Sequence, residues 1–233
     1  MNALKNTAEP TVLRPGDPAV DGSFLEPYTS EWSVGQLKPD GTTRKVGDWA
    51  DRVEIEEQNG RPAVRRTQTA IFGATRFRYV NVADPATMAP ILSEEESSKG
   101  SFEHLVFDGT RVRHRHRATP AGGVEERDLP LAMPVFQFTG MYGILLVTFP
   151  LHEGSFFQLP SFEVKQADHI EWLSFRVKGR EGIPTVAGEA EAWIVESEPG
   201  PGARFRFSLR REPPYVFRLD HEKDGTILRW DLL

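Results

Sequence analysis

The stretch FEHLVFDGTRVRHRHR, residues 102–117, determines the fold class of this chain of 233 residues. Apolar and polar side chains alternate on both sides of the dipeptide Asp108-Gly109. Alternation with a period of two is typical of a strand that buries one face, and an Asp-Gly pair favours a tight hairpin turn. The stretch therefore predicts two antiparallel strands.

The same alternation continues on both sides of this hairpin. It recurs in segments 51–58, 63–72, 75–82, 169–179, 189–198, 204–212 and 215–233. Turn-forming pairs separate the segments: Asn59-Gly60, Gly122-Gly123, Pro199-Gly200 and Asp224-Gly225. About ten short strands joined by such turns predict an antiparallel meander that closes, or half closes, around one core.

One segment interrupts this pattern. Residues 133–154, MPVFQFTGMYGILLVTFPLHEG, are apolar almost throughout. A helix from Gln137 to Val147 fits, since an element without a polar face is buried on all sides, although the glycines and Thr139 leave a buried strand open. The expected fold is mainly β: an antiparallel half-barrel or closed barrel of about ten strands packed around one apolar helix. Residues 1–22 are expected to form a flexible arm, and residues 23–233 a single barrel-like domain.

Composition excludes several classes of protein. The net charge of -6 argues against nucleic-acid binding, which needs a basic surface. The longest apolar run, Gly143 to Phe149, is about one-third of the length that spans a bilayer. The absence of cysteine excludes disulfides, thiol catalysis and thiolate-bound metals. Without an apolar signal segment at the start, we expect a cytoplasmic protein, or a periplasmic one if an export signal has been removed.

The C-terminal half resembles a large bacterial family of unknown function. The resemblance lies in three segments: FPLHEGSFFQLPSFE (149–163), FRVKGREGIPTVAGEAEAWIVESE (175–198) and PPYVFRLDHEKDGTILRWDL (213–232). The family's central hairpin pattern falls here on Val177, Gly179, Glu181, Ile183, Thr185 and Gly188, with Pro184 as an additional residue. The match is good over Pro130 to Leu233, and from Tyr28 onward it concerns the arrangement of strands only.

This resemblance implies a fold and no activity. The family is similar to the lipoprotein-localisation factors, in which an antiparallel half-barrel wraps around a helix and encloses an apolar cavity. Its motifs are structural, so they transfer no catalytic residue. Many members are exported, which differs from the expectation drawn from the N-terminal residues here.

Two histidines in RVRHRHR are candidate functional residues. On a strand Val112, His114 and His116 share one face, and the other face takes Arg111, Arg113, Arg115 and Arg117. Three interpretations follow. The strand has a solvated basic face, or the histidines chelate a metal, or they lie inside the barrel as polar ligand contacts or acid–base groups.

The metal interpretation was tested against the cupins, small barrels that use an H-x-H pair. They need a carboxylate four or five residues after the second histidine, where this chain has Pro120 and Ala121. A second motif with glycine and histidine is absent from LPSFEVKQ, residues 159–166. We therefore expect no metal and no other cofactor.

The arginines on the other face of the strand can pair with carboxylates of the same chain, without a ligand. Glu125, Glu126 and Asp128 follow the strand, and a hairpin through Gly122-Gly123 brings them opposite the arginines. Cross-strand ion pairs are therefore expected.

Aromatic residues indicate a ligand more clearly. A half-barrel leaves an apolar cavity in which a few polar groups fix the orientation of a ligand. The residues expected to contact it are Phe136, Phe138, Tyr142, His152, Trp172, Phe175 and Trp193. The chain has no G-x-S-x-G, phosphate loop or H-E-x-x-H motif, and Glu94 to Glu96 are expected in a solvated loop.

Two functions follow from this pattern. The first is binding of a hydrophobic or amphipathic small molecule, such as a lipid. The second is a metal-independent isomerase, cyclase or hydratase that uses His114, His116 and Tyr142 for proton transfer on a hydrophobic substrate. Histidines within hydrogen-bond reach of Tyr142 favour the enzyme, and an apolar lining without them favours binding.

Overall fold

The computed structural model describes residues 9–38, 40–58, 60–186, 188–198 and 203–233. This part of the chain forms one sheet of fifteen strands and one helix. The strands are β1 (Thr11–Val12), β2 (Tyr28–Leu37), β3 (Thr43–Gln58), β4 (Arg61–Phe72), β5 (Thr75–Ala83), β6 (Pro90–Ser97), β7 (Phe102–Asp108), β8 (Arg111–Arg117), β9 (Glu125–Pro130), β10 (Phe156–Phe162), β11 (Ile170–Thr185), β12 (Gly188–Ser197), β13 (Arg204–Leu209), β14 (Val216–Lys223) and β15 (Thr226–Leu232). The helix is α1 (Phe138–Val147).

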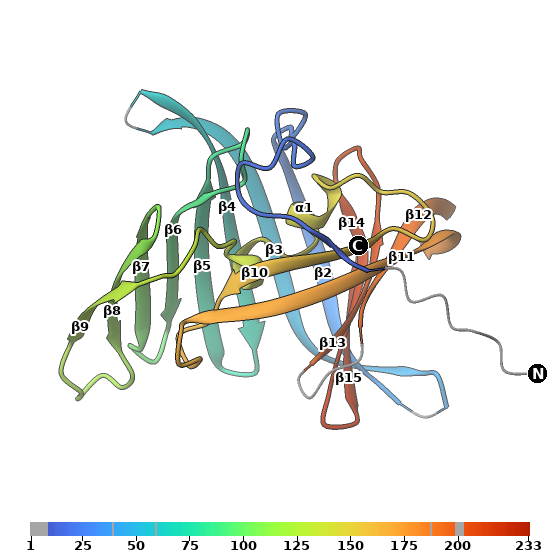
Figure 1. Cartoon of the computed structure of the whole chain (residues 1–233). Helices are drawn as coiled ribbons and strands as arrows, with labels where there is room; N and C mark the ends of the chain where they lie inside the picture. The colour runs from blue at the N-terminus through green and yellow to red at the C-terminus, as the bar shows by residue number, and fades with distance from the viewer. Residues whose placement is uncertain (1–8, 39, 59, 187, 199–202) are drawn as a thin grey trace, which may run out of the picture.

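The chain builds the sheet in two meanders. The first runs from β2 to β9, and the second runs from β10 to β15 and returns to pair with β2. Between them the chain crosses the hollow of the curved sheet as α1 (Figure 1). All neighbouring strands are antiparallel except β1, which pairs in parallel with β10. The edges of the sheet are β1 and β9, so it does not close.

The structure corrects two details of the expected architecture. A closed barrel is wrong, because β9 does not pair with β10 within the described residues. The strand number exceeds the approximately ten expected, chiefly because β2, β6, β9 and β10 lack a clean alternation of apolar and polar residues. The mainly β class itself is confirmed.

The hairpin turns at two dipeptides are confirmed. Asp108-Gly109 joins β7 to β8, and Asp224-Gly225 joins β14 to β15. Both residues of the second pair have positive φ, 50° and 72°, as a two-residue turn between twisted strands requires. Asn59 and the pair Pro199-Gly200, also predicted as turns, lie outside the described residues.

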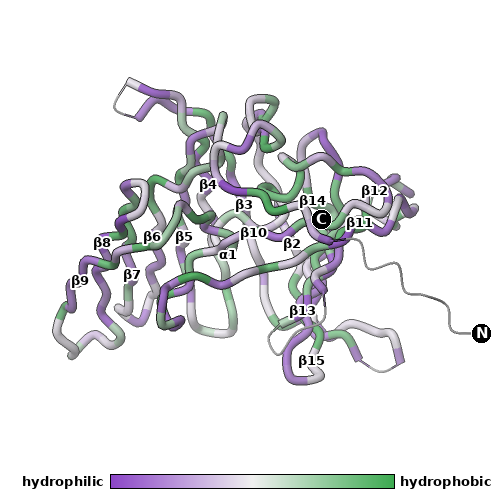
Figure 2. Tube along the Cα trace, in the orientation of Figure 1, coloured by the Kyte–Doolittle hydropathy of each residue, from purple (hydrophilic) through white to green (hydrophobic). Residues whose placement is uncertain are grey.

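The core lies between α1 and the inner face of the sheet. The predicted helix is confirmed, and eight of its ten residues are buried. The ring of Phe138 at the start of α1 packs on the rings of Phe175, Phe205 and Phe207. Along the strands the tube in Figure 2 changes repeatedly between hydrophilic and hydrophobic colour, as expected for a sheet with one wet face. Among the described residues, no helix has both the length and the apolar character needed to cross a membrane.

A smaller apolar cluster lies where the two meanders come close. Phe107 of β7 and Phe162 of β10 meet edge to face, with 5.5 Å between ring centroids. Leu129 of β9 and Val135 of the segment that leads into α1 complete the cluster. Within the described residues no strand ladder joins the two meanders here, so side-chain packing holds them together beside an isolated bridge between Phe136 and Ser161.

The described part of the N-terminal segment packs against the protein. Leu13 is fully buried and Val20 nearly so, and both belong to the main core. The Leu13 amide donates to the carbonyl of Gln158 at 2.9 Å. Residues 11–20 thus differ from the flexible arm expected over 1–22, because three prolines and a polar composition hid two core side chains. Residues 1–8 lie outside the described part.

Candidate ligand-binding site

An aromatic cavity of about 220 Å³ lies between α1 and the sheet, where the two meanders join. We define its wall by the rings that line it: Trp32, Trp49, Phe72, Tyr79, Tyr142, Phe205, Phe207 and Trp230. The indole of Trp49 stacks on Tyr79 with 5.4 Å between centroids and 11° between planes. When the Gln68 amide is oriented to satisfy its neighbours, its oxygen accepts a hydrogen bond from Trp49 Nε1 at 3.0 Å.

A polar cavity of about 220 Å³ adjoins the aromatic one. The two cavities share Trp49, Gln68, Tyr79 and Tyr142, so these side chains form the boundary between them. The remaining lining is almost entirely polar: Asn81, Ser93, Glu94, Glu95, Glu103, Gln137, Thr139 and Gly140. An apolar compartment thus lies next to an acidic one.

The register of the sheet explains why so many polar groups face inward. Cα partners on adjacent strands project on the same face. One series of partners runs across β3 to β9 and consists of Asp51, Gln68, Tyr79, Glu95, Glu103, His116 and Glu125. We call these residues the polar row. Because Tyr79 lines both cavities, the row lies on the inner face and extends from the core to the β9 edge.

Tyr142 interrupts α1 at the boundary between the cavities. Its φ of 34° and ψ of −124° are not helical, so the helix consists of two short pieces on either side of it. A bulky residue with positive φ stores strain, which persists only where the surroundings enforce it. Burial raises the pKa of the Tyr142 hydroxyl, so the group stays protonated at neutral pH.

Arg66 enforces this break in α1. Its Nη1 donates to the carbonyl oxygen of Met141 at 3.0 Å, which orients the peptide that precedes Tyr142. Its Nη2 lies 2.6 Å from Asp51 Oδ2, and Nε also donates to that carboxylate. Both side chains are almost completely buried, so the ion pair is a fixed link between the polar row and the helix.

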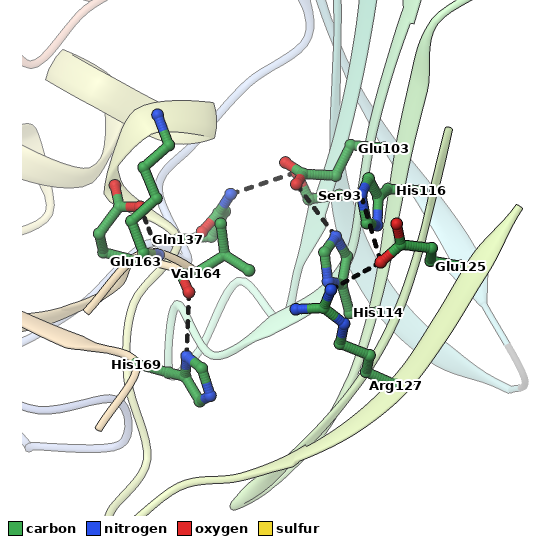
Figure 3. A network of polar contacts seen from close by, with 11 residues as sticks. Ser93, Glu103, His114, His116, Glu125, Arg127, Gln137, Glu163, Val164 and His169 are labelled. Atoms are coloured by element: carbon green, nitrogen blue, oxygen red, sulfur yellow. Dashed lines mark hydrogen bonds and ion pairs between the residues drawn. The ribbon is translucent and has the colours of Figure 1, made fainter. Parts of the chain in front are cut away.

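The two histidines of RVRHRHR face inward and stack on each other, with 4.8 Å between ring centroids (Figure 3). His114 is 4% exposed, and its Nε2 lies 3.1 Å from Glu103 Oε1. His116 Nε2 lies 4.0 Å from Glu125, which also pairs with Arg127 at 2.6 Å. Among the described residues, no group of three or more His, Asp or Glu is placed to hold a metal ion.

The predicted ion pairs on the outer face are confirmed for Asp128 and Glu126, but not for Glu125, which is the Cα partner of His116 on the inner face. Arg111 lies 3.0 Å from Asp128, and Arg115 lies 3.1 Å from Glu126. All four side chains are more than half exposed, so each pair contributes little to stability.

The environment of His114 predicts a pH-dependent stability. Burial lowers its pKa below the ordinary 6.5, against the opposing effect of the Glu103 carboxylate. The unfolded chain therefore binds this proton first, and stability falls as the pH falls from 6.5 toward the lowered pKa. Urea unfolding at a series of pH values should show a shallower decline in His114→Gln than in the natural protein.

His221 provides the control for this prediction, because burial lowers its pKa in the same direction. The His221→Gln variant should lose the contribution of His221 to the fall in stability with pH and keep the contribution of His114. An unchanged pH profile in His114→Gln would contradict the prediction.

A family model described as "Protein of unknown function (DUF3108)" matches residues 28–226. The chain belongs to this family. The match runs from the start of β2 to the end of β14, so it extends beyond the C-terminal half that carries the sequence resemblance. No curated protein matches the chain, and no solved structure does.

The DUF3108 chain brings only one of the predicted site residues to the cavities. Tyr142 lines both. Phe136, Phe138 and Phe175 are fully buried in the core, packed on other rings. The remaining three lie outside the cavity linings: His152 is exposed, Trp172 is 41% exposed, and Trp193 lies under the guanidinium of Arg180.

His114 and His116 are not placed against Tyr142 in the DUF3108 chain. Tyr142 lines the two cavities, whereas neither histidine does. His114 is linked to the polar cavity only through Glu103. The histidine in the aromatic cavity is His221, whose ring stacks on Phe205 at 4.8 Å.

The acidic side of the site could not be predicted from the hydrophobic pattern of the sequence. Glu94 to Glu96 belong to β6 and not to a loop, and Glu95 is the Cα partner of Tyr79 and Glu103. Three consecutive glutamates hide the alternation that would have shown which of them faces inward. The signal that remained was the length of the segment, since the nineteen residues between the strands predicted at 75–82 and 102–108 are enough for another strand.

Proposed function

We propose that this protein binds an amphipathic small molecule across the two cavities. The apolar part of the ligand occupies the aromatic cavity, and its polar end occupies the polar cavity. The observation that carries the proposal is the shared boundary of Trp49, Gln68, Tyr79 and Tyr142 between an apolar space and an acidic one. A ligand with one apolar and one polar end matches this arrangement.

The physical basis is ordinary for small-molecule sites. Such sites are concave, mainly apolar, and carry a few placed polar groups that orient the ligand. Burial of apolar surface contributes roughly 25 cal/mol per Å², and aromatic rings provide that surface with little loss of conformational entropy. The rings of the aromatic cavity are held by stacking with one another, so the space is largely formed before a ligand enters.

A half-barrel similar to that of the lipoprotein-localisation factors is part of this proposal. Its support is a curved antiparallel sheet with one apolar helix in its hollow (Figure 1). Such a shape shields an apolar ligand from water on one side and leaves an opening along the other.

Binding is favoured over acid–base catalysis by the placement of the titratable groups. His114 and His116 are absent from the linings that contain Tyr142, and the histidine that does line the aromatic cavity, His221, has its ring stacked on Phe205. Burial raises the pKa of Tyr142, which makes it a poor proton acceptor at neutral pH. The aromatic cavity therefore offers an apolar surface and hydrogen-bond donors, as a binding protein requires.

Filling the aromatic cavity with a larger side chain should weaken ligand binding strongly. Leu219 of β14 lines it, and Leu219→Trp places an indole in the space of about 220 Å³. We expect the affinity for a neutral probe, N-phenyl-1-naphthylamine, to fall by at least about tenfold, a loss of 1.4 kcal/mol. The increase in probe fluorescence on titration measures the affinity.

Ile71→Trp is the matched control, because Ile71 adjoins the cavity residue Phe72 on β4 and is 38% exposed. It should bind the probe as the natural protein does. Circular dichroism establishes that both variants are folded. Equal affinities in folded Leu219→Trp and the natural protein would refute the proposed function.

A further inference from the structure

We propose that the polar end of the ligand is a cation, an aliphatic amine or ammonium group. The inference rests on the proposed function and specifies the chemistry of the ligand. Its basis is the composition of the polar cavity, whose boundary and lining combine carboxylates, π faces and a buried amide without a hydrogen-bond partner.

The carboxylates that face the polar cavity are Glu95 and Glu103, whereas the side chain of Glu94, like that of Glu96, points to the opposite face of β6. Glu94 lies 3.5 Å from His104, and Glu103 lies 3.1 Å from His114. Glu95 has no ion-pair partner among the described residues. Because burial and the nearby Glu103 raise the pKa of Glu95, its ionised form is destabilised there. A ligand cation would relieve this cost, whereas a ligand anion would increase it.

The boundary with the aromatic cavity offers a second contact for a cation. The rings of Trp49 and Tyr79 stack there and line both cavities. A cation near an aromatic face is attracted by the ring quadrupole, most strongly at tryptophan. Since burial raises the pKa of Tyr79, its ring remains a neutral phenol.

A buried amide provides an independent indication of a donor ligand. Asn81 of β5 lines the polar cavity and is 2% exposed. Its Oδ1 has no hydrogen-bond partner, and Gln137 Oε1 is in the same situation. Buried acceptors without donors cost free energy. Because the Asn81 amide can rotate by half a turn, its oxygen is available to an N–H group in the cavity.

Arg66 does not offset this negative character. It lines the aromatic cavity and is absent from the lining of the polar one. Its guanidinium donates to Asp51 through both Nε and Nη2, so its charge is already compensated. The polar cavity therefore presents acceptors and negative charge to a ligand and offers no cationic side chain for a carboxylate or phosphate.

Three eight-carbon probes that differ only in their polar end test the inference. Octylammonium, octanol and octanoate are titrated into the full-length protein by isothermal calorimetry at low salt and neutral pH. We expect octylammonium to bind about tenfold more tightly than octanol, and octanoate to bind most weakly. The Glu95→Gln variant should lose most of the advantage of octylammonium and bind octanol as before.

Glu96→Gln is the matched control, because it removes the same charge from the next residue of β6, on the opposite face. It should leave all three affinities unchanged, which separates the local contact from the net charge. If all probes bind equally, or octanoate binds best, the charge inference is overturned while cavity binding stands. If Glu96→Gln weakens octylammonium as much as Glu95→Gln does, the site is also overturned. If none of the probes binds, the proposed function itself fails.

Discussion

Replacing Arg66 with methionine is expected to lower the free energy of unfolding by about 3–5 kcal/mol, the cost of breaking a buried ion pair from one side. The substitution leaves the Asp51 carboxylate buried without its cation, because both side chains are almost fully excluded from solvent. It also removes the donor to the carbonyl oxygen of Met141. Urea unfolding followed by tryptophan fluorescence measures the loss.

The double variant Arg66→Met with Asp51→Leu separates charge from packing. Removing both members of a buried ion pair leaves no uncompensated charge, so stability should recover by more than half. Recovery remains incomplete, since the Met141 carbonyl still lacks its donor. A loss below about 1 kcal/mol in Arg66→Met, within the range of a surface pair, would contradict the assignment of this pair as a fixed link.

Truncating Phe138 to alanine is expected to cost about 3–5 kcal/mol, as for other fully buried phenylalanines. The ring lies at the start of α1, and its centroid is 5.1 Å from that of Phe175 and 5.7 Å from that of Phe205. Alanine leaves a void among rings that belong to α1, β11 and β13, so the helix loses a group of aromatic contacts with the second meander. The midpoint of the unfolding transition should therefore move to a lower urea concentration.

Trp172→Ala provides the comparison, because Trp172 was also expected to contact a ligand and is 41% exposed. It should change the free energy of unfolding by at most about 0.5 kcal/mol. Similar losses in the two variants would show that the packing of Phe138 is not central to the core. If both folded variants bind the naphthylamine probe normally, neither side chain contacts it.

The strands were predictable where one apolar face meets one polar face. The hairpin at Asp108-Gly109 and its arginine–carboxylate pairs followed from the alternation of side chains and the turn pair alone. Other strands were hard to recognise because their inner face carries polar residues, which resemble the residues of a loop. In β6 the inner face carries Ser93 and Glu95, so the hydrophobic pattern disappears although the backbone is a regular strand.

The site was less predictable than the fold, for a similar reason. Aromatic residues near α1 in sequence, such as Phe136 and Phe138, were expected to face the ligand, but they fill the core. The cavity rings come from strands far apart in the chain, including Trp49 of β3 and Trp230 of β15. Only the pairing of β15 with β2 brings them within 6.1 Å, and no local pattern encodes that contact.

The pairing of β15 with β2 also determines when the protein can fold. During synthesis β2 emerges well before its partner β15, which follows the other described strands of both meanders. Contacts between residues so distant in sequence slow folding. The entropy of closing a long loop is lost before the hydrogen bonds between the two strands can form. Until then β2 presents an unpaired edge that other nascent chains can join. We therefore expect refolding to be slow and to lose yield as protein concentration rises.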